Sequence, residues 1–98
     1  MKRIERTRID RELLDVIRSV EVDDFDELYE QAVEAAITID KMPRDQELEN
    51  RDLACLFLAW NEDYGYFSDV LGYAGIDATF IFELGFINCC ILEALGER

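Results

Sequence analysis

The chain has 98 residues, half of them apolar, and we expect residues 1–98 to form one domain with a modest hydrophobic core. This apolar content excludes a chain that is disordered throughout. The formal net charge of -13 disfavours direct binding to nucleic acid or to an acidic membrane surface, because both repel an acidic domain.

Apolar residues recur at helical spacing along the whole chain, which predicts an all-α fold, a compact bundle of four to five helices with an apolar C-terminal helix. The first helix begins at Thr7 or Asp10 and reaches Val20. The second begins at Asp24 or the residue before it, because acids crowd this turn and favour a helix N-terminus. It ends by Pro43, since proline cannot continue a helix.

The third predicted helix lies within residues 45–61, and its N-terminus is capped by Asp45 or by Asn50. The fourth runs from about Glu62 to Ala74. Its residues Tyr64, Phe67 and Leu71 continue the inward-facing stripe of Trp60. The helix stops at Gly75, because glycine tolerates the left-handed conformation that often ends a helix.

The fifth predicted helix, from Asp77 or Thr79 to Leu95, is apolar nearly all round. Its second apolar face consists of Phe82, Phe86, Cys89 and Leu92. Such a helix is either central in the domain, or its second face meets another copy in a homodimer. Gly85 in mid-helix costs about 1 kcal/mol relative to alanine, so we expect a neighbouring helix to approach closely there.

The sequence disfavours catalysis. It has no histidine, which removes the commonest general base and a frequent transition-metal ligand. Its five glycines fit no phosphate-binding loop. Paired carboxylates remain a formal option, but acids are so frequent here that any two lie near each other. We therefore expect a protein that is not an enzyme and has no catalytic residues, metal or cofactor.

The three cysteines, Cys55, Cys89 and Cys90, form no disulfide framework, and we interpret them as small apolar core residues in a reducing compartment. The basic N-terminal residues are not followed by an apolar signal segment. No apolar stretch is long enough to span a membrane. These features predict a cytoplasmic protein.

The negative charge is concentrated after the N-terminal segment. Residues 1–18 hold six bases and four acids, whereas residues 19–97 hold 19 acids and only three bases. Three acidic groups stand out: Asp23, Asp24, Asp26, Glu27, Glu30 and Glu34; then Asp45, Glu47, Glu49 and Asp52; then Glu62, Asp63 and Asp69. Such acids are often only a hydrated surface. However, a surface selected for solubility mixes positive and negative side chains. The strong excess of acids over bases in residues 19–97 therefore indicates a binding surface for a basic partner.

The spacing of the first acidic group resembles a phosphate track. Asp23, Glu27, Glu30 and Glu34 fall on one helical stripe about 16 Å long. Duplex DNA presents about ten phosphates over that length, so two or three acidic segments, or a dimer, would be needed to approach it. We expect the partner to be a basic nucleic-acid-binding protein of the host, and no direct contact between this chain and nucleic acid.

Four short segments, DFDEL at 24–28, AVEAA at 32–36, YFSDVL at 66–71 and GID at 75–77, resemble parts of the phage Ocr-type antirestriction proteins. That family is small, very acidic, helical and dimeric, and it imitates duplex DNA to occupy restriction enzymes. Small acidic anti-CRISPR proteins of phages are broadly similar. The resemblance implies a phage inhibitor of restriction or CRISPR machinery, although the basic N-terminal segment departs from the family's pattern.

A second hypothesis is a non-catalytic helical adaptor or regulatory domain that binds its partner through apolar contacts. Its candidate interface residues are Tyr66, Tyr73, Phe82 and Phe86. The two hypotheses differ in what carries affinity. Charge reversal would weaken binding in the first and would matter little in the second, in which truncation of Phe82 or Phe86 would matter a great deal.

Overall fold

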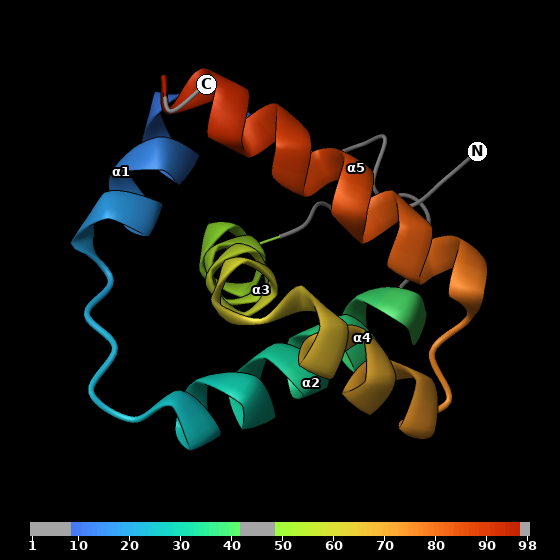
Figure 1. Cartoon of the computed structure of the whole chain (residues 1–98). Coiled ribbons are helices and arrows are strands. Elements are labelled where there is room, and N and C mark those ends of the chain that lie inside the picture. Colours follow the sequence, from blue (N-terminus) through green and yellow to red (C-terminus); the bar gives the residue numbers. More distant parts are fainter. Residues whose placement is uncertain (1–8, 42–48, 97–98) are drawn as a thin grey trace.

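The computed structural model describes residues 9–41 and 49–96, which form helices and no strand (Figure 1). The helices are α1 (Arg11–Ser19), α2 (Phe25–Lys41), α3 (Asn50–Glu62), α4 (Tyr64–Tyr73) and α5 (Ala78–Ala94). The predicted all-α bundle is therefore confirmed. Thr7 and two of the predicted partner-binding acids, Asp45 and Glu47, lie outside the described residues.

Aspartate carboxylates accept backbone N–H groups at the N-termini of four helices. The capping residues are Asp10 for α1, Asp24 for α2, Asp63 for α4 and Asp77 for α5. Such a cap typically contributes about 1 kcal/mol to stability. At α3 the cap position belongs to Glu49, whose side chain makes no capping hydrogen bond. The expectation that Asn50 caps α3 is wrong, because Asn50 is already its first helical residue.

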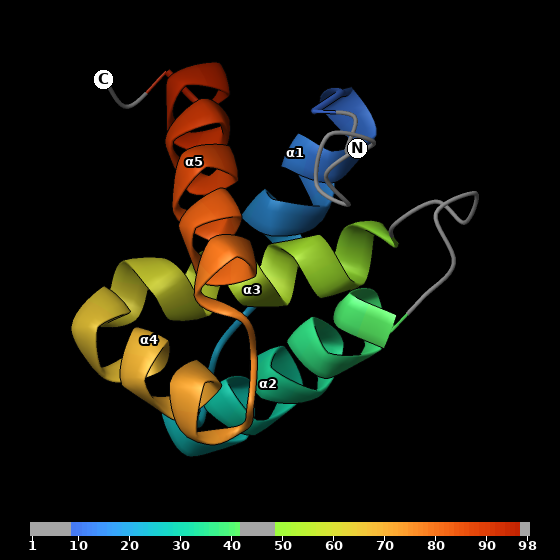
Figure 2. The same cartoon turned by 90° about the vertical axis from the view of Figure 1, so that its right-hand side faces the viewer.

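Helix α3 is the centre of the bundle and packs against the other four helices (Figures 1 and 2). Its residues 53–57 and Ala59 are all buried. α2 and α5 lie on opposite sides of α3, and α5 packs mainly on α3 and α4. The interpretation of the fifth helix as central is therefore wrong, because α3 occupies that position and leaves α5 one inward face.

The predicted close approach at Gly85 is confirmed. A Cβ atom at Gly85 would lie 3.1 Å from Cζ2 of Trp60, which reaches α5 from α3. The Trp60 ring stacks on Tyr64, with centroids 6.0 Å apart, and meets Phe67 edge-on at 6.4 Å. The expectation that Tyr64 faces the core is wrong, because its side chain lies over Trp60 and remains 66% exposed.

Two polar residues of α5, Asn88 and Glu83, are buried. Asn61 donates from Nδ2 to Asn88 Oδ1 at 2.6 Å and to the Phe57 carbonyl at 2.8 Å, which ties α3 to α5. Glu83 Oε2 has no hydrogen-bond partner among the described residues. Because these polar groups face inward, the outward side of α5 is more apolar than the sequence of the helix suggests.

We expect opposite effects from two glycine substitutions. At Gly72 in α4, no atom outside the neighbouring backbone of its own helix lies within 4 Å of the position that a Cβ would take. Gly72→Ala should therefore raise the free energy of unfolding by up to about 1 kcal/mol. Gly85→Ala must displace the Trp60 ring, which two other rings hold, and should lower that free energy. Urea unfolding followed by the fluorescence of the single tryptophan measures both. An equal gain for the two variants would contradict the close contact.

Candidate acidic binding surface

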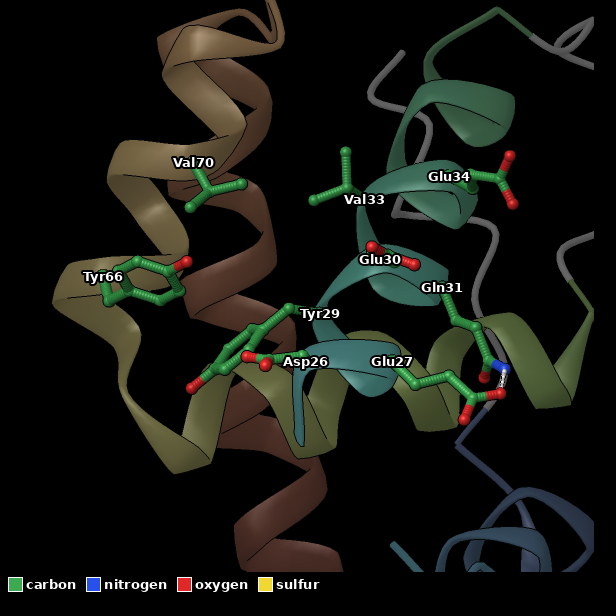
Figure 3. A pocket seen from close by; sticks show the side chains of 9 residues that line it. All are labelled: Asp26, Glu27, Tyr29, Glu30, Gln31, Val33, Glu34, Tyr66 and Val70. Atoms are coloured by element: carbon green, nitrogen blue, oxygen red, sulfur yellow. Dashed lines mark hydrogen bonds between the residues drawn. The ribbon is translucent and has the colours of Figure 1, made fainter. Parts of the chain in front are cut away.

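An open groove of about 780 Å³ lies between α2 and α4 (Figure 3). Its lining residues are Asp26, Glu27, Tyr29, Glu30, Gln31, Val33, Glu34, Tyr66 and Val70. Four of the nine are acids and none is a base. We call this surface the acidic groove. All four acids come from α2, which also contributes Tyr29, Gln31 and Val33, whereas α4 contributes Tyr66 and Val70. Tyr29 and Val33 lie on the side of α2 toward α4, and Glu27 and Glu34 lie on the side away from it (Figure 3).

The α2 wall carries the predicted helical stripe, with one correction. Glu27, Glu30 and Glu34 are exposed on the helix, and Gln31 donates from Nε2 to Glu27 Oε1 at 3.3 Å. Asp23 precedes the helix, which begins at Phe25, and so does not share the helical stripe.

Asp23 and Asp24 instead line a second hollow, of about 220 Å³, beside the first. Glu21 and Glu27 add two more acids to its lining, and Arg51 is its one base. Because Glu27 and Gln31 line both hollows, the first acidic group covers one continuous surface.

Tyr29 marks the place where acids of two segments meet. Its ring contacts Tyr66 edge-on, with centroids 5.1 Å apart. Burial raises the pKa of the Tyr29 phenol above its ordinary value of 10.0, and the negative charges of Glu62 and Asp63 raise it further. Asp26 acts in the same direction from α2. The structure therefore brings two acids of the third predicted group to the end of the acidic groove.

The described acids of the second group do not join this surface. Glu49 and Asp52 lie at the N-terminal end of α3, beside the C-terminal end of α2 (Figure 2), and neither lines the groove. Burial and the Glu49 charge raise the pKa of Asp52, while Arg51 opposes them. Asp69 is exposed on α4 but is also not among the lining residues.

The apolar and aromatic part of the groove is not evident from the sequence. Tyr29 belongs to the apolar stripe of α2, and Val33 and Val70 are ordinary helix residues in the pattern. Tyr66 is predicted only as a residue for apolar contacts. The approach of α4 to α2 makes these side chains neighbours, and no local signal indicates that approach.

The predicted second face of α5 is mostly exposed. Phe82 is 73% and Phe86 64% exposed, Cys89 is exposed, and Leu92 is partly buried against the core. The interpretation of all three cysteines as core residues is wrong for Cys89, because it follows Phe86 on the outward side of the helix. Within residues 9–41 and 49–96, no helix has both the length and the apolarity for a membrane crossing.

Comparison of the chain with protein-family models, with curated proteins and with solved structures gave no match. In the described part of the chain, no three His, Cys, Asp or Glu residues are grouped so that they could hold a metal ion. The acidic groove combines four carboxylates with the rings of Tyr29 and Tyr66.

Titration of Tyr29 tests whether the acids gather there. The folded pKa is raised, so the neutral phenol stabilises the fold below about pH 10, and this contribution is lost as the pH rises through the folded pKa. We expect phenolate absorbance, assigned by difference with Tyr29→Phe, to show a pKa above 10.0 that Glu62→Gln and high salt both lower. Asp69→Asn is the control and should leave it unchanged. Equal effects of Glu62→Gln and Asp69→Asn would contradict the arrangement.

Proposed function

We propose that this protein is a non-enzymatic inhibitor that occupies a basic nucleic-acid-binding surface of another protein by imitating a phosphate backbone. The observation that carries the proposal is the acidic groove, which four acids and no base line. The charges of Glu62 and Asp63 act on Tyr29 at its end, so the negative surface extends beyond one helix. A surface of this kind attracts lysine and arginine side chains and speeds their approach.

The density of charge supports imitation of one strand of backbone. Asp26, Glu27, Glu30 and Glu34 are spread over about 12 Å of helix axis, which is about one carboxylate every 4 Å. A single DNA strand carries one phosphate for about every 3.4 Å of axis. One groove therefore approximates a single phosphate track, whereas a duplex would need a second acidic surface alongside it.

The resemblance of four segments to the Ocr-type antirestriction proteins narrows the proposed partner. In this narrower form, the target is the restriction or CRISPR machinery of a bacterial host, and the protein acts in the host cytoplasm. CRISPR effector complexes hold nucleic acid in a positively charged channel, which is a basic surface of the kind proposed here. The absence of histidine from the sequence supports an inhibitor that works by binding and not by a reaction.

Capture from a bacterial lysate on the immobilised protein tests the proposal. We expect the retained proteins to be basic nucleic-acid-binding proteins, and we expect both high salt and added duplex DNA to release them, because both compete with an electrostatic contact. Replacement of Glu30 and Glu34 by lysine should reduce capture at least about tenfold. These side chains are exposed and have no capping role, so the fold should persist.

Lysines at Glu12 and Asp15 provide a matched control. Both positions are exposed on α1, outside the groove, and the double replacement changes the net charge equally. It should leave most of the capture intact. Retention that survives both high salt and duplex DNA, or an equal loss in the two double variants, would refute imitation of a phosphate backbone.

A second candidate function, an adaptor that binds through apolar contacts, is favoured by one observation. All four of its predicted interface residues are more than half exposed: Tyr66 at 53%, Tyr73 at 93%, Phe82 at 73% and Phe86 at 64%. In that case capture would survive high salt and the Glu30 and Glu34 replacements. Truncation of Phe82 or Phe86 would abolish it, since buried aromatic side chains commonly dominate such interfaces.

A further inference from the structure

The outward face of α5 is an apolar surface with nothing packed against it in the described chain. Phe82, Phe86 and Cys89 follow one another at helical spacing on this side, and all three are exposed. The polar residues within the helix, Glu83 and Asn88, are buried on its other sides. The first charged residue on the outward side after Phe82 is Glu93, near the end of the helix.

This surface continues beyond α5. Trp60 reaches the helix at Gly85, and Tyr64 stacks on Trp60 with ring centroids 6.0 Å apart. Tyr64 is 66% exposed, so it adds a third large ring to the edge of the same region. The aromatic face is defined by Tyr64, Phe82, Phe86 and Cys89.

The size of the aromatic face is appropriate for a small dimer interface. If each ring residue contributes about 200 Å² when fully exposed, the three rings expose about 400 Å² in each chain. The largest apolar patch on a typical monomer has a similar area, about 300–600 Å², and is often a functional surface. Two copies would cover about 800 Å² of ring surface, and Cys89 within the face and Leu92 beside it would extend the contact toward the roughly 1,200 Å² of a specific interface.

The charge distribution selects a second copy as the occupant. Two chains of charge -13 repel each other over most of their surfaces, but Phe82, Phe86 and Cys89 carry no charge. α5 also lies across α3 from α2 (Figures 1 and 2), so a basic partner is attracted to the opposite side of the molecule. Glu62 and Asp63 lie next to Tyr64 in the sequence, so they flank the aromatic face only at the edge formed by Tyr64. The uncharged contact is therefore centred on Phe82 and Phe86.

We infer that the aromatic face binds the same face of a second copy, with twofold symmetry. α2 of each chain stays on the far side of α3 from this contact, so both acidic grooves remain accessible. The inference does not depend on the proposed function. Dimerisation should strengthen with salt, whereas binding of a basic partner to the acidic groove should weaken with it. Salt screens the repulsion between two acidic chains and leaves the apolar contact in place.

Sedimentation equilibrium of the full chain tests the dimer. The mass should rise from 11.4 kDa toward twice that value as the concentration increases, and the association constant should be higher at high salt than at low salt. Phe86→Glu should lower that constant at least about tenfold, because it places a charge in the contact. The smaller change Phe82→Ser should lower it in the same direction.

Thr38→Glu is the control, because it adds the same charge at an exposed residue of α2, outside both the aromatic face and the lining of the acidic groove. Circular dichroism verifies that each variant remains helical. A mass of one chain at every concentration and at high salt would overturn the inference. A dimer that Phe86→Glu and Thr38→Glu weaken equally, or do not weaken, would overturn it as well.

Discussion

Helix α3 is buried on nearly all of its sides, and this burial governs where the other four helices pack. Residues 53–57 contain no polar side chain other than a cysteine thiol, and every one of them is buried. Removal of this much apolar surface from water requires neighbours all around the helix. The α2 side is lined with small residues, Ala32, Ala35 and Ala36, which are buried and allow α2 to pack extensively on α3. α1 takes another side, and the remaining sides are left to α4 and α5.

That arrangement also decides where the charge lies. Because the alanine face of α2 is buried, its acidic side is exposed, and the short turn at Asp63 places α4 beside it. Like charges three or four residues apart weaken a helix by a few tenths of a kcal/mol per pair. The burial of the opposite face of α2 offsets this cost, so an acidic surface persists that an isolated helix would support poorly.

The segregation of α2 and α5 on opposite sides of α3 gives the molecule two surfaces of different chemistry. The acidic groove offers charge, which acts at long range and weakens with salt. The aromatic face offers apolar contact, which acts at short range and does not. A protein with both can bind a basic partner at one surface while the other contacts a molecule of its own kind, and the two contacts need not compete.

Most helix boundaries were predictable from the sequence, because they depend on local chemistry. Asp10, Asp24 and Asp77 accept N–H groups within three residues, and Gly75 and Gly96 adopt positive φ after helices end. The start of α3 was not predictable in this way, since its cap position holds a glutamate that makes no capping bond. Tyr64 and Cys89 were misplaced for a different reason, because the apolar character of a side chain does not specify which of two faces of its helix meets the core.

The candidate site likewise has features that local chemistry predicts and features that it does not. The acidic stripe of α2, the apolar second face of α5 and the need for small volume at Gly85 could be predicted from the residues alone, because helical period and side-chain size are local properties. Two outcomes emerged only from the packing of the helices: Glu62 and Asp63 join Tyr29 while Glu49 and Asp52 lie elsewhere, and α3 instead of α5 is central. Those outcomes depend on which helices share the limited surface of α3, and that competition involves residues far apart in the chain.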